Sequence, residues 1–459
     1  MILERIVSDG LSHNSYILIS GGGAAVIDPR RDCDIYISIA TGHDAVITHI
    51  FETHRNEDYV IGSRELSDRC GAEIFHGSKM DFSYGKPVQE GNRFSIGDLE
   101  LVVLETPGHT MESISIMVID KAVSDVPYLV FTGDALFAGD TGRTDLFGQE
   151  LRAKVSGQLH ESIYTKILTA GDGAIICPAH GAGSICGSDI SDHAYTTVGY
   201  EKKTNPLLQI GRDAFVDRKV REHHYIPPYF KKMEELNKNG APLIHRLPDL
   251  KALGNNEIKD YIRKGAQVVD IRSPTSFGGA HIPGSISIWR DGLAAFIGWN
   301  LNYSDPIILV DDFNLGLEEI SRIFIRMGYD NIFGYLAGGF PAWFREAEES
   351  ASLDLWTVPD LKETLRDDSL FLLDVRDINN RVRYGHIRES VHIYVGELPE
   401  RMQEVPRDRQ VVVYCDAGYK GSLGASLLQK AGYDRVGNLL GGMGAWMKAA
   451  YPVEKDIRS

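Results

Sequence analysis

The second half of this chain contains a long internal repeat. Two pairs of segments lie 104 positions apart: VDIR at 269–272 with LDVR at 373–376, and MGYD at 327–330 with AGYD at 431–434. Two further pairs drift by one position: AHI at 280–282 with GHI at 385–387, and AW at 342–343 with AW at 445–446. The units of solenoid proteins are much shorter than this period. The repeat therefore predicts two copies of one domain.

Each copy alternates apolar runs with helical stretches. The clearest β-branched runs are residues 306–310 in the first copy and 411–414 in the second. Strands that alternate with helices predict a parallel sheet with helices on both faces. The turn-rich stretch 237–242 and the acidic stretch 346–355 fit linkers. We therefore expect domains at residues 1–240, 241–350 and 351–459.

Residues 1–240 show a different pattern, in which short strand-like runs end in polar clusters. The clusters are THRNEDY at 53–59, TPGHT at 106–110 and TGDAL at 132–136. Binding and catalytic residues concentrate on loops that a rigid sheet holds in place. His54, His109 and Asp134 would offer one metal ion two imidazoles and one carboxylate. Such a set leaves coordination positions open and suits a reactive Fe(II).

Length, charge and cysteine usage narrow the class of protein. A chain of 459 residues indicates two to four domains. Its formal net charge of -16 argues against nucleic acid and anionic membranes as partners. No apolar run is long enough for a transmembrane helix, and the first residues lack the pattern of a signal peptide. Five scattered cysteines argue against a disulfide framework, so we expect a cytoplasmic protein.

The first domain resembles the metallo-β-lactamase superfamily. The three clusters occur in that family's order, preceded by Asp28 and Pro29 and followed by PAHG at 178–181. GDTGRTD at 139–145 and the segment 181–206 make the domain similar, more narrowly, to persulfide dioxygenases fused to rhodanese domains. The resemblance implies a multidomain α/β chain that begins with an αββα sandwich. It also implies one Fe(II) per chain on the two histidines and the aspartate of the clusters, with zinc as an ion that could replace it during purification.

The resemblance further implies that a second metal site is incomplete. Asn56 and Tyr59 stand where binuclear hydrolases of the superfamily have histidines, and only Asp58 and His180 remain beside the shared Asp134. So few ligands rarely hold a catalytic ion. These four residues are expected to support the ligands by hydrogen bonds or to be relics of a lost site.

The reaction implied by the resemblance is oxidation of a low-molecular-weight thiol persulfide, such as glutathione persulfide, by O2 to sulfite. Thr110 and Arg143 would lie near the substrate, where an arginine can pair with a carboxylate; a structural ion pair is the alternative for Arg143. We expect a homo-oligomer, either a dimer or a tetramer. Two other functions stay open: a glyoxalase II-like thioester hydrolase, which needs two metals, and a non-catalytic sulfur-binding or regulatory protein.

Cys415 has the setting of a sulfur carrier. It follows a predicted strand and precedes a short loop and a helix, so that loop N–H groups and the helix dipole favour its thiolate. Lys420 adds positive charge. This segment, with LDVR, GHI and GGMGAW around it, resembles the rhodanese family, which implies thiosulfate sulfurtransferase chemistry at Cys415. By the repeat offset, Asp311 takes the place of the cysteine in the earlier copy, and a carboxylate cannot carry sulfane sulfur. The remaining cysteines, expected to be structural, are Cys33, Cys70, Cys177 and Cys186.

Overall fold

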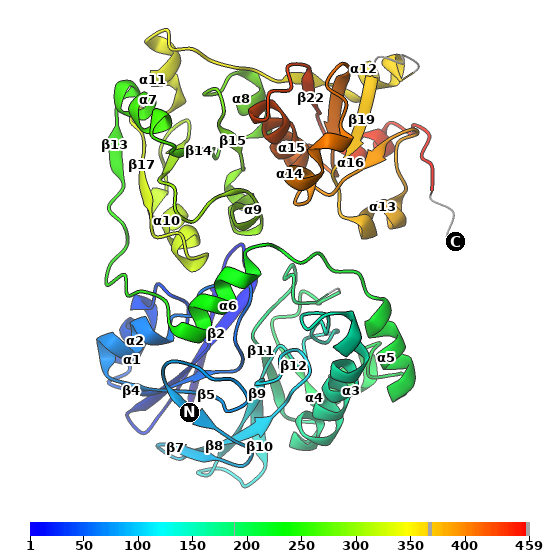
Figure 1. The fold of residues 1–459 in the computed structure, drawn as a ribbon. Coiled ribbons are helices and arrows are strands. Elements are labelled where there is room, and N and C mark those ends of the chain that lie inside the picture. Colours follow the sequence, from blue (N-terminus) through cyan, green and yellow to red (C-terminus); the bar gives the residue numbers. More distant parts are fainter. Residues whose placement is uncertain (188, 366–369, 456–459) are drawn as a thin grey trace. The chain divides into compact units, whose positions relative to one another are not determined.

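A computed structural model describes residues 1–187, 189–365 and 370–455 (Figure 1). The chain divides into two compact units. One comprises Met1–Arg246 with Ile325–Gly328, and the other comprises Leu247–Phe324 with Tyr329–Ser459. Among the described residues, every helix is too short or too polar to cross a membrane.

Two mixed sheets form the centre of the first unit. The strand order of the first sheet is β1 (Ile2–Ser8), β2 (His13–Ser20), β3 (Gly23–Ile27), β4 (Val46–Glu52), β5 (Glu73–Gly77) and β6 (Lys86–Val88). The order of the second is β12 (Thr196–Thr197), β11 (Ile175–Pro178), β10 (Pro127–Gly133), β9 (Ile114–Asp120), β8 (Leu99–Glu105) and β7 (Arg93–Ile96). In each sheet, antiparallel hairpins are joined to parallel strands that require a crossover.

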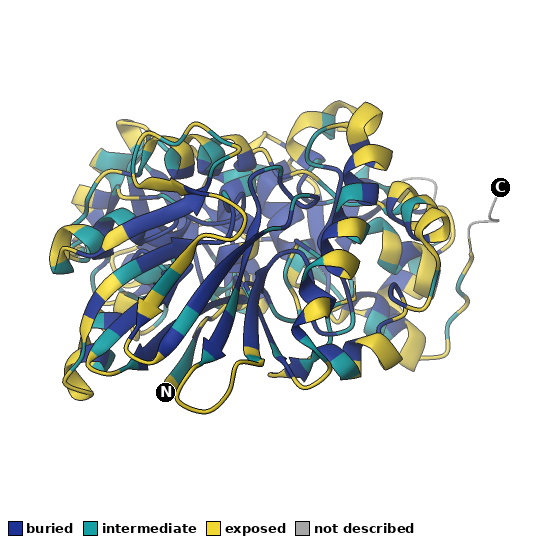
Figure 2. Cartoon of the chain, turned by 90° about the horizontal axis from the view of Figure 1, so that it is seen from below, coloured by how far each residue is buried: buried dark blue, intermediate teal, exposed yellow. Residues whose placement is uncertain are grey.

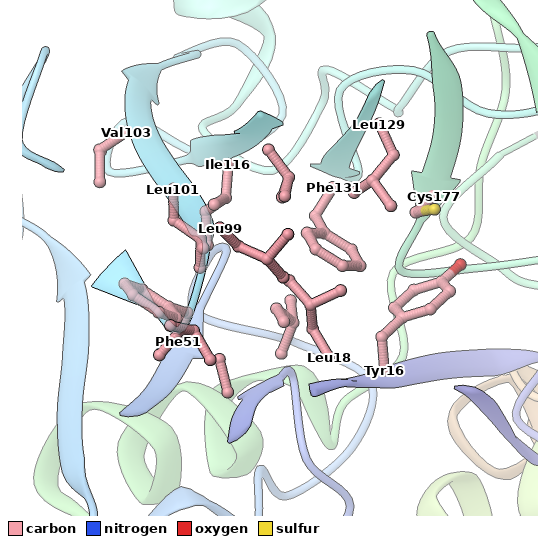
Figure 3. Packing of buried hydrophobic residues seen from close by; sticks show 14 of the residues in the cluster. Tyr16, Leu18, Phe51, Leu99, Leu101, Val103, Ile116, Leu129, Phe131 and Cys177 are labelled. Carbon is pink, nitrogen blue, oxygen red and sulfur yellow. The ribbon is translucent and has the colours of Figure 1, made fainter. Parts of the chain in front are cut away.

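Period-two alternation explains why the two sheets pack face to face. Tyr16 and Leu18 on β2 point into a core shared with Leu99 and Leu101 of β8 and with Phe131 of β10 (Figure 3). Successive strand residues point to opposite faces of a sheet. Burial of each such side chain contributes roughly 1.5–3 kcal/mol, so this layer is a main source of stability for the unit.

The opposite faces of both sheets are covered by helices. Ile17 and Ile19 of β2 pack with Tyr36 of α1 (Asp34–Gly42) and Leu66 of α2 (Ser63–Cys70). Val130 of β10 packs with residues of α3, η1 and α5. The helices that follow α2 in this unit are α3 (Gln149–Thr165), η1 (Ile167–Ala170), α4 (Val198–Thr204), α5 (Arg212–Arg221) and α6 (Phe230–Asn239). The strands in Figure 2 are mostly dark blue, whereas the helices carry exposed yellow positions. The expected αββα sandwich is confirmed.

The second unit contains two parallel sheets with the same strand order. The first is β13 (Lys251–Leu253), β17 (Ile332–Leu336), β16 (Ile307–Val310), β14 (Gln267–Asp270) and β15 (Ile286–Ser287). The other is β18 (Asp354–Trp356), β22 (Val436–Leu439), β21 (Gln410–Tyr414), β19 (Leu370–Asp374) and β20 (Val391–His392). The fold confirms the two copies that the repeat predicts.

Helices surround these sheets in matching positions. In the first copy they are α7 (Asn255–Arg263), α8 (Pro274–Gly279), η2 (Arg290–Gly292), α9 (Leu293–Asn300), α10 (Leu317–Arg326) and α11 (Phe340–Arg345). In the second they are α12 (Val358–Thr364), α13 (Ile378–Tyr384), α14 (Leu398–Arg401), η3 (Met402–Glu404), α15 (Tyr419–Lys430) and α16 (Gly442–Lys448).

The repeated sequence segments make the same contacts in both copies. Arg272 pairs with Asp270 and donates to the Ala280 carbonyl at 2.7 Å. Arg376 likewise pairs with Asp374 and donates to the Gly385 carbonyl at 2.8 Å. The VDIR and LDVR segments therefore hold the AHI and GHI segments through a buried charge-assisted network.

The other two repeated segments each supply one aromatic hydrogen-bond donor. The Tyr329 hydroxyl donates to Leu301 O at 2.9 Å, and the Tyr433 hydroxyl donates to Val405 O at 3.0 Å. Trp343 and Trp446 each donate their indole N–H at 2.8 Å to a carbonyl six residues later. Buried aromatic groups of this kind need such partners, which explains why the repeat keeps these residue types.

Candidate functional site

The predicted metal ligands lie together at strand ends of the first unit. His54 follows β4, His109 follows β8 and Asp134 follows β10. Asp134 Oδ2 lies 3.8 Å from His54 Nε2 and 3.5 Å from His109 Nε2. All three side chains are buried. Both sheets therefore contribute to one cluster, as the strand-end positions predict.

Hydrogen bonds at Nδ1 orient both imidazole rings. The Thr53 hydroxyl donates to Asp28 Oδ2 at 2.7 Å and lies 2.9 Å from His54 Nδ1, so it accepts from that nitrogen. His109 Nδ1 lies 3.0 Å from the Arg143 carbonyl, which can only accept. Each ring therefore carries a proton on Nδ1 and directs Nε2 into the cluster, where a neutral ring can bind a metal.

Gly133 allows the end of β10 to approach Thr53. Its φ of 53° lies in the left-handed region, and a Cβ at this position would fall 2.7 Å from Thr53 Oγ1. Only glycine accepts both conditions without strain. The Thr-Gly-Asp motif thus places Asp134 beside His54 for a steric reason.

The electrostatics of the cluster favour a cation. Burial lowers the pKa of His54, so that this ring is neutral. Burial opposes ionisation of Asp134, but His180 and His54 outweigh it and lower the pKa of the carboxyl. Burial also raises the pKa of Asp28 to about 7, despite the hydrogen bonds from Thr53. Burial opposes protonation of His109, but Glu57 and Asp134 outweigh it and raise the pKa of this ring to about 9. A metal ion that binds His109 would therefore displace a proton.

Several buried polar atoms in this region have no hydrogen-bond partner among the described residues. They are His54 Nε2, Asn56 Oδ1, Glu57 Oε2, Asp58 Oδ1, Tyr59 OH, His109 Nε2 and His180 Nε2. Each unsatisfied buried group costs roughly 1–3 kcal/mol. A divalent ion with bound water would satisfy such atoms, so the residues present fit a metal.

The remaining residues of the expected second site surround Asp134. His180 Nδ1 lies 2.8 Å from Asp134 Oδ1, and His180 Nε2 lies 3.0 Å from Asp58 Oδ2. The ring of Tyr59 packs on His13 with centroids 4.0 Å apart. The side-chain amide of Asn56 donates to His54 O at 3.2 Å. His180 is thus placed to hold the Asp134 carboxylate by a hydrogen bond.

Two residues join the cluster without having been singled out by the motif pattern. Glu57 Oε1 lies 3.0 Å from His109 Nε2, and ligand atoms of His54, Glu57 and His109 lie within 4.8 Å of one another. Cys186 forms a similar group with Asp58 and His180. In the sequence, Glu57 is a carboxylate inside the first polar cluster, and Cys186 lies in the loop after His180. These positions are the sequence features that could have pointed to both residues.

Arg143 and Thr110 are both buried and hydrogen-bonded to neighbouring residues. Arg143 is fully buried, and its Nε and Nη2 donate to both carboxylate oxygens of Asp145 at 2.7 and 2.8 Å. Its remaining contacts include the carbonyls of Ile185 and Tyr225. The structural ion pair, one of the two alternatives for Arg143, describes this arrangement. Thr110 is buried too, and its hydroxyl lies 2.7 Å from Ser113 Oγ.

In the second unit, Cys415 lies between β21 and α15 in a loop that donates to its sulfur. The Gly418 N–H lies 3.1 Å from Cys415 Sγ, and Gly418 has a φ of 95° that favours glycine. Lys420 pairs with Asp416 at 3.0 Å. The N-terminus of α16 contributes as well, because Met443 N–H donates to the Cys415 carbonyl at 2.8 Å.

Asp311 occupies the matching position in the first copy. It follows β16, and its carbonyl accepts from Phe340 N–H at 2.8 Å, as that of Cys415 does from Met443. The Asp311 carboxylate pairs with Arg290 at 3.2 Å. Helix α10 begins at Leu317, six residues after Asp311, whereas α15 begins at Tyr419, four residues after Cys415. The loop of the first copy therefore differs in length as well as in chemistry.

The two copies contact each other at the helix that follows Cys415. Ser287 N–H donates to Ser426 Oγ at 3.0 Å, and the hydroxyls of Ser287 and Ser422 lie 2.9 Å apart. The rings of Trp289 and Tyr419 have centroids 5.2 Å apart. The first copy thus supports α15 and the side chain at its N-terminus.

Comparison with known proteins adds three relatives and two family matches. The model of the metallo-beta-lactamase superfamily matches residues 8–180, and that of the rhodanese-like domain matches residues 255–346 and 357–449. A solved metallo-beta-lactamase structure from Staphylococcus aureus subsp. aureus COL is 30% identical, with a TM-score of 0.65, and the match covers 73% of this chain and 98% of that one.

Two curated relatives match separate parts of the chain. Hydroxyacylglutathione hydrolase GloC of Haemophilus influenzae is 28% identical over 207 residues, covering 40% of this chain and 87% of the relative. A sulfurtransferase of Allochromatium vinosum is 34% identical over 94 residues, covering 20% of this chain and 87% of the relative.

Proposed function

This chain belongs to the metallo-beta-lactamase superfamily and carries two rhodanese-like domains after that fold, and from this premise we propose that it oxidises thiol persulfides. The proposed reaction takes a low-molecular-weight thiol persulfide, O2 and water to the thiol, sulfite and two protons. The outer sulfur of a persulfide would also be transferred to Cys415. The observation that supports this pairing is that one chain contains both a group of potential metal ligands and a cysteine whose sulfur accepts a backbone N–H.

The metal cluster suits this chemistry because its protein groups are held in place before any ligand binds. His54 and His109 would bind the ion through Nε2, and Asp134 through a carboxylate oxygen that His180 orients. A bound Fe(II) would supply the redox chemistry that lets O2 react with a closed-shell persulfide. The ligand side chains are buried, which limits access of bulk water to that ion.

Cys415 supplies the second half of the proposed function. A persulfide would transfer its outer sulfur to the Cys415 thiolate, which releases the thiol and leaves a persulfide on the enzyme. Sulfite would then attack that outer sulfur, so that the S–S bond to Cys415 breaks and thiosulfate forms. The Gly418 N–H, 3.1 Å from Sγ, stabilises the thiolate that leaves.

A Cys415→Ser variant tests the coupling between the two halves. We expect it to consume O2 with glutathione persulfide at the wild-type rate and to release sulfite in place of thiosulfate. The measurement is O2 uptake together with separation of sulfite and thiosulfate. Unchanged thiosulfate output from the variant would contradict the proposed role of Cys415.

A second candidate function is hydrolysis of a glutathione thioester at two metal ions. The observation that favours it is the group formed by Asp58, His180 and Cys186, which could hold another ion beside the first. Two ions would generate and orient hydroxide, and the similarity to hydroxyacylglutathione hydrolase GloC covers this domain. Two metal equivalents per chain with turnover of S-lactoylglutathione would support this function; one equivalent with no turnover would exclude it.

A further inference from the structure

Asn56 lies in the loop between the ligands of the metal cluster and offers it no imidazole nitrogen. The side-chain amide of Asn56 donates to the carbonyl of His54, and its backbone carbonyl accepts from Asn237 at 2.5 Å. The next residue along the chain, Glu57, is fully buried and points to the metal cluster.

Glu57 and His109 face each other inside the cluster. His109 Nδ1 lies 3.0 Å from the Arg143 carbonyl, so it carries a proton and Nε2 points away from that carbonyl. Glu57 Oε1 lies 3.0 Å from that Nε2. This distance fits either a proton on Nε2 that bonds Glu57 or a cation that both groups bind in place of the proton. Neither His109 Nε2 nor Glu57 Oε2 has a hydrogen-bond partner among the described residues.

The separations between the donor atoms match those around a single ion. The Asp134 oxygen lies 3.5 Å from His109 Nε2 and 3.8 Å from His54 Nε2, and the Glu57 oxygen lies 3.0 Å from His109 Nε2. Neighbouring ligands that each lie about 2.1 Å from a metal are roughly 3.0–3.5 Å apart. Ligand atoms of His54, Glu57 and His109 also lie within 4.8 Å of one another, so small movements would bring these three onto one ion that Asp134 binds.

The balance of charge at the site also favours Glu57 as a ligand. The candidate ligands are buried, and a divalent ion that Asp134 binds without a second carboxylate would keep one positive charge in excess. A second carboxylate from Glu57 would neutralise the ion. Uncompensated charge in a buried site is costly, which favours the neutral set.

The loop that carries Glu57 is fixed on both sides. Asn237 of α6 donates to the carbonyls of Asn56 and Tyr59 at 2.5 and 2.8 Å and accepts from the Ile61 N–H at 3.0 Å. The Arg55 N–H donates to Glu112 Oε1 at 3.0 Å. These bonds determine the direction of Glu57, so its position facing His109 is a property of the folded loop.

We propose that Glu57 is a metal ligand, so that His54, His109, Asp134 and Glu57 together hold one divalent first-row transition ion. Four protein ligands would leave two positions of an octahedral ion open, enough for two small molecules. The added carboxylate favours Fe²⁺, Mn²⁺ or Co²⁺ over ions that prefer soft ligands. This inference deepens the proposed function, because it concerns the same site, but metal binding tests it without persulfide or O2.

The test is a titration of the full chain with Co²⁺ alone, followed by visible absorption and calorimetry. We expect Glu57→Gln to weaken Co²⁺ binding at least tenfold and to alter the absorption bands, because one ligand is lost. Glu201→Gln is the matched control, since Glu201 is also buried and accepts hydrogen bonds, from the Thr196 hydroxyl and the Gly139 N–H, without facing a histidine Nε2. It is expected to bind Co²⁺ within about threefold of the wild type.

If Glu57 is only a hydrogen-bond partner of His109, glutamine in its place keeps a polar neighbour and frees Nε2. Co²⁺ affinity and spectrum would then be unchanged or the affinity would rise, and the proposal would be overturned. Loss of affinity in Asn56→Ala but not in Glu57→Gln would overturn it as well.

A crystal structure of the Co²⁺-loaded, unsubstituted chain provides a second measurement that does not depend on the folding of a variant. A Glu57 oxygen within about 2.3 Å of the ion supports the proposal. A Glu57 carboxylate beyond 3 Å, with water in its place, contradicts it. Failure of persulfide oxidation with this coordination intact would count against the proposed function and not against Glu57.

Discussion

Thr53 shows how a single residue can control a metal site that it does not touch. Its hydroxyl bridges Asp28 and His54, and this bridge sets the ring orientation of His54. Loss of such a support typically weakens metal binding by 10–100-fold. We therefore expect Thr53→Val to lower Co²⁺ affinity by about that factor while the fold is kept.

Thr144→Val is the matched control for this prediction. Thr144 is equally buried, but its hydroxyl bonds Ser156 and not a ligand histidine. Calorimetric titration of both variants with Co²⁺ makes the comparison. Equal loss of affinity in the two would mean that any buried threonine hydroxyl matters to the same degree, contrary to the role assigned to Thr53.

Glu52 gives the first domain a pH-dependent stability. Burial raises the pKa of Glu52 to about 8, although the Tyr84 hydroxyl donates to both carboxyl oxygens at 2.9 and 3.0 Å. A carboxyl with a higher pKa in the folded state retains its proton there, so stability falls as pH rises from about 4.5 to about 8. Glu52→Gln removes this titration.

Between pH 5 and pH 8, we expect the free energy of unfolding of Glu52→Gln to rise on the order of 1–3 kcal/mol relative to that of the wild type. Scanning calorimetry of both proteins at the two pH values measures the effect as a difference in Tm that grows by a few degrees toward pH 8. A difference that is the same at pH 5 and pH 8 would show that Glu52 is ionised throughout.

The positions of His54, His109 and Asp134 at predicted strand ends, in motifs of a known order, were enough to predict that they lie together. Glu57 and Cys186 could not be predicted in the same way. Their positions depend on loop conformations fixed by distant contacts, such as those of Asn237 with the loop of residues 56–61. A motif records which residues occur, whereas such contacts depend on the fold.

At the level of elements, the two rhodanese-like copies differ most at one loop. The four-residue loop before α15 presents the Gly418 N–H to Cys415, while the six-residue loop before α10 leaves Asp311 paired with Arg290. The strand order of the two sheets is otherwise the same. If Cys415 carries sulfur as proposed, the loop and not the sheet distinguishes the two copies.

This difference predicts that a cysteine alone does not activate the first copy. In a Cys415→Ser, Asp311→Cys double variant, we expect less than about 5% of wild-type thiosulfate formation from sulfite and glutathione persulfide, because the longer loop lacks a donor placed like Gly418. The Cys415→Ser single variant is the baseline. Activity in the double variant well above this baseline would show that the loop of the first copy is competent.

Sequence periodicity predicted the elements well where strands alternate with helices, as in both parallel sheets. The repeat also identified the residues that hold each copy together, since Asp270 with Arg272 and Asp374 with Arg376 make equivalent contacts. Residues 325–328 could not be assigned from periodicity. They continue a helix of the first copy but belong to the first compact unit, and only three-dimensional contacts show this.

The whole molecule combines a metallo-beta-lactamase-like domain with rhodanese-like domains. In the proposed function, both act on the sulfur of the persulfide. The metallo-beta-lactamase superfamily includes hydrolases, so the fold of the first domain does not decide between oxidation and hydrolysis. The presence of Cys415 in the same chain favours oxidation of a sulfur compound as the reaction of the metal domain. A rhodanese domain would be of little use to a thioester hydrolase, whereas it can use both the substrate and the product of persulfide oxidation.

The most direct test of this account is O2 uptake by the full chain, purified without O2 and loaded with one equivalent of Fe²⁺, when glutathione persulfide is added. We expect uptake that depends on both the persulfide and the iron, with one O2 consumed for every two persulfides as thiosulfate accumulates. No persulfide-dependent uptake by the iron-loaded chain, with hydrolysis of S-lactoylglutathione at two metals per chain, would contradict it.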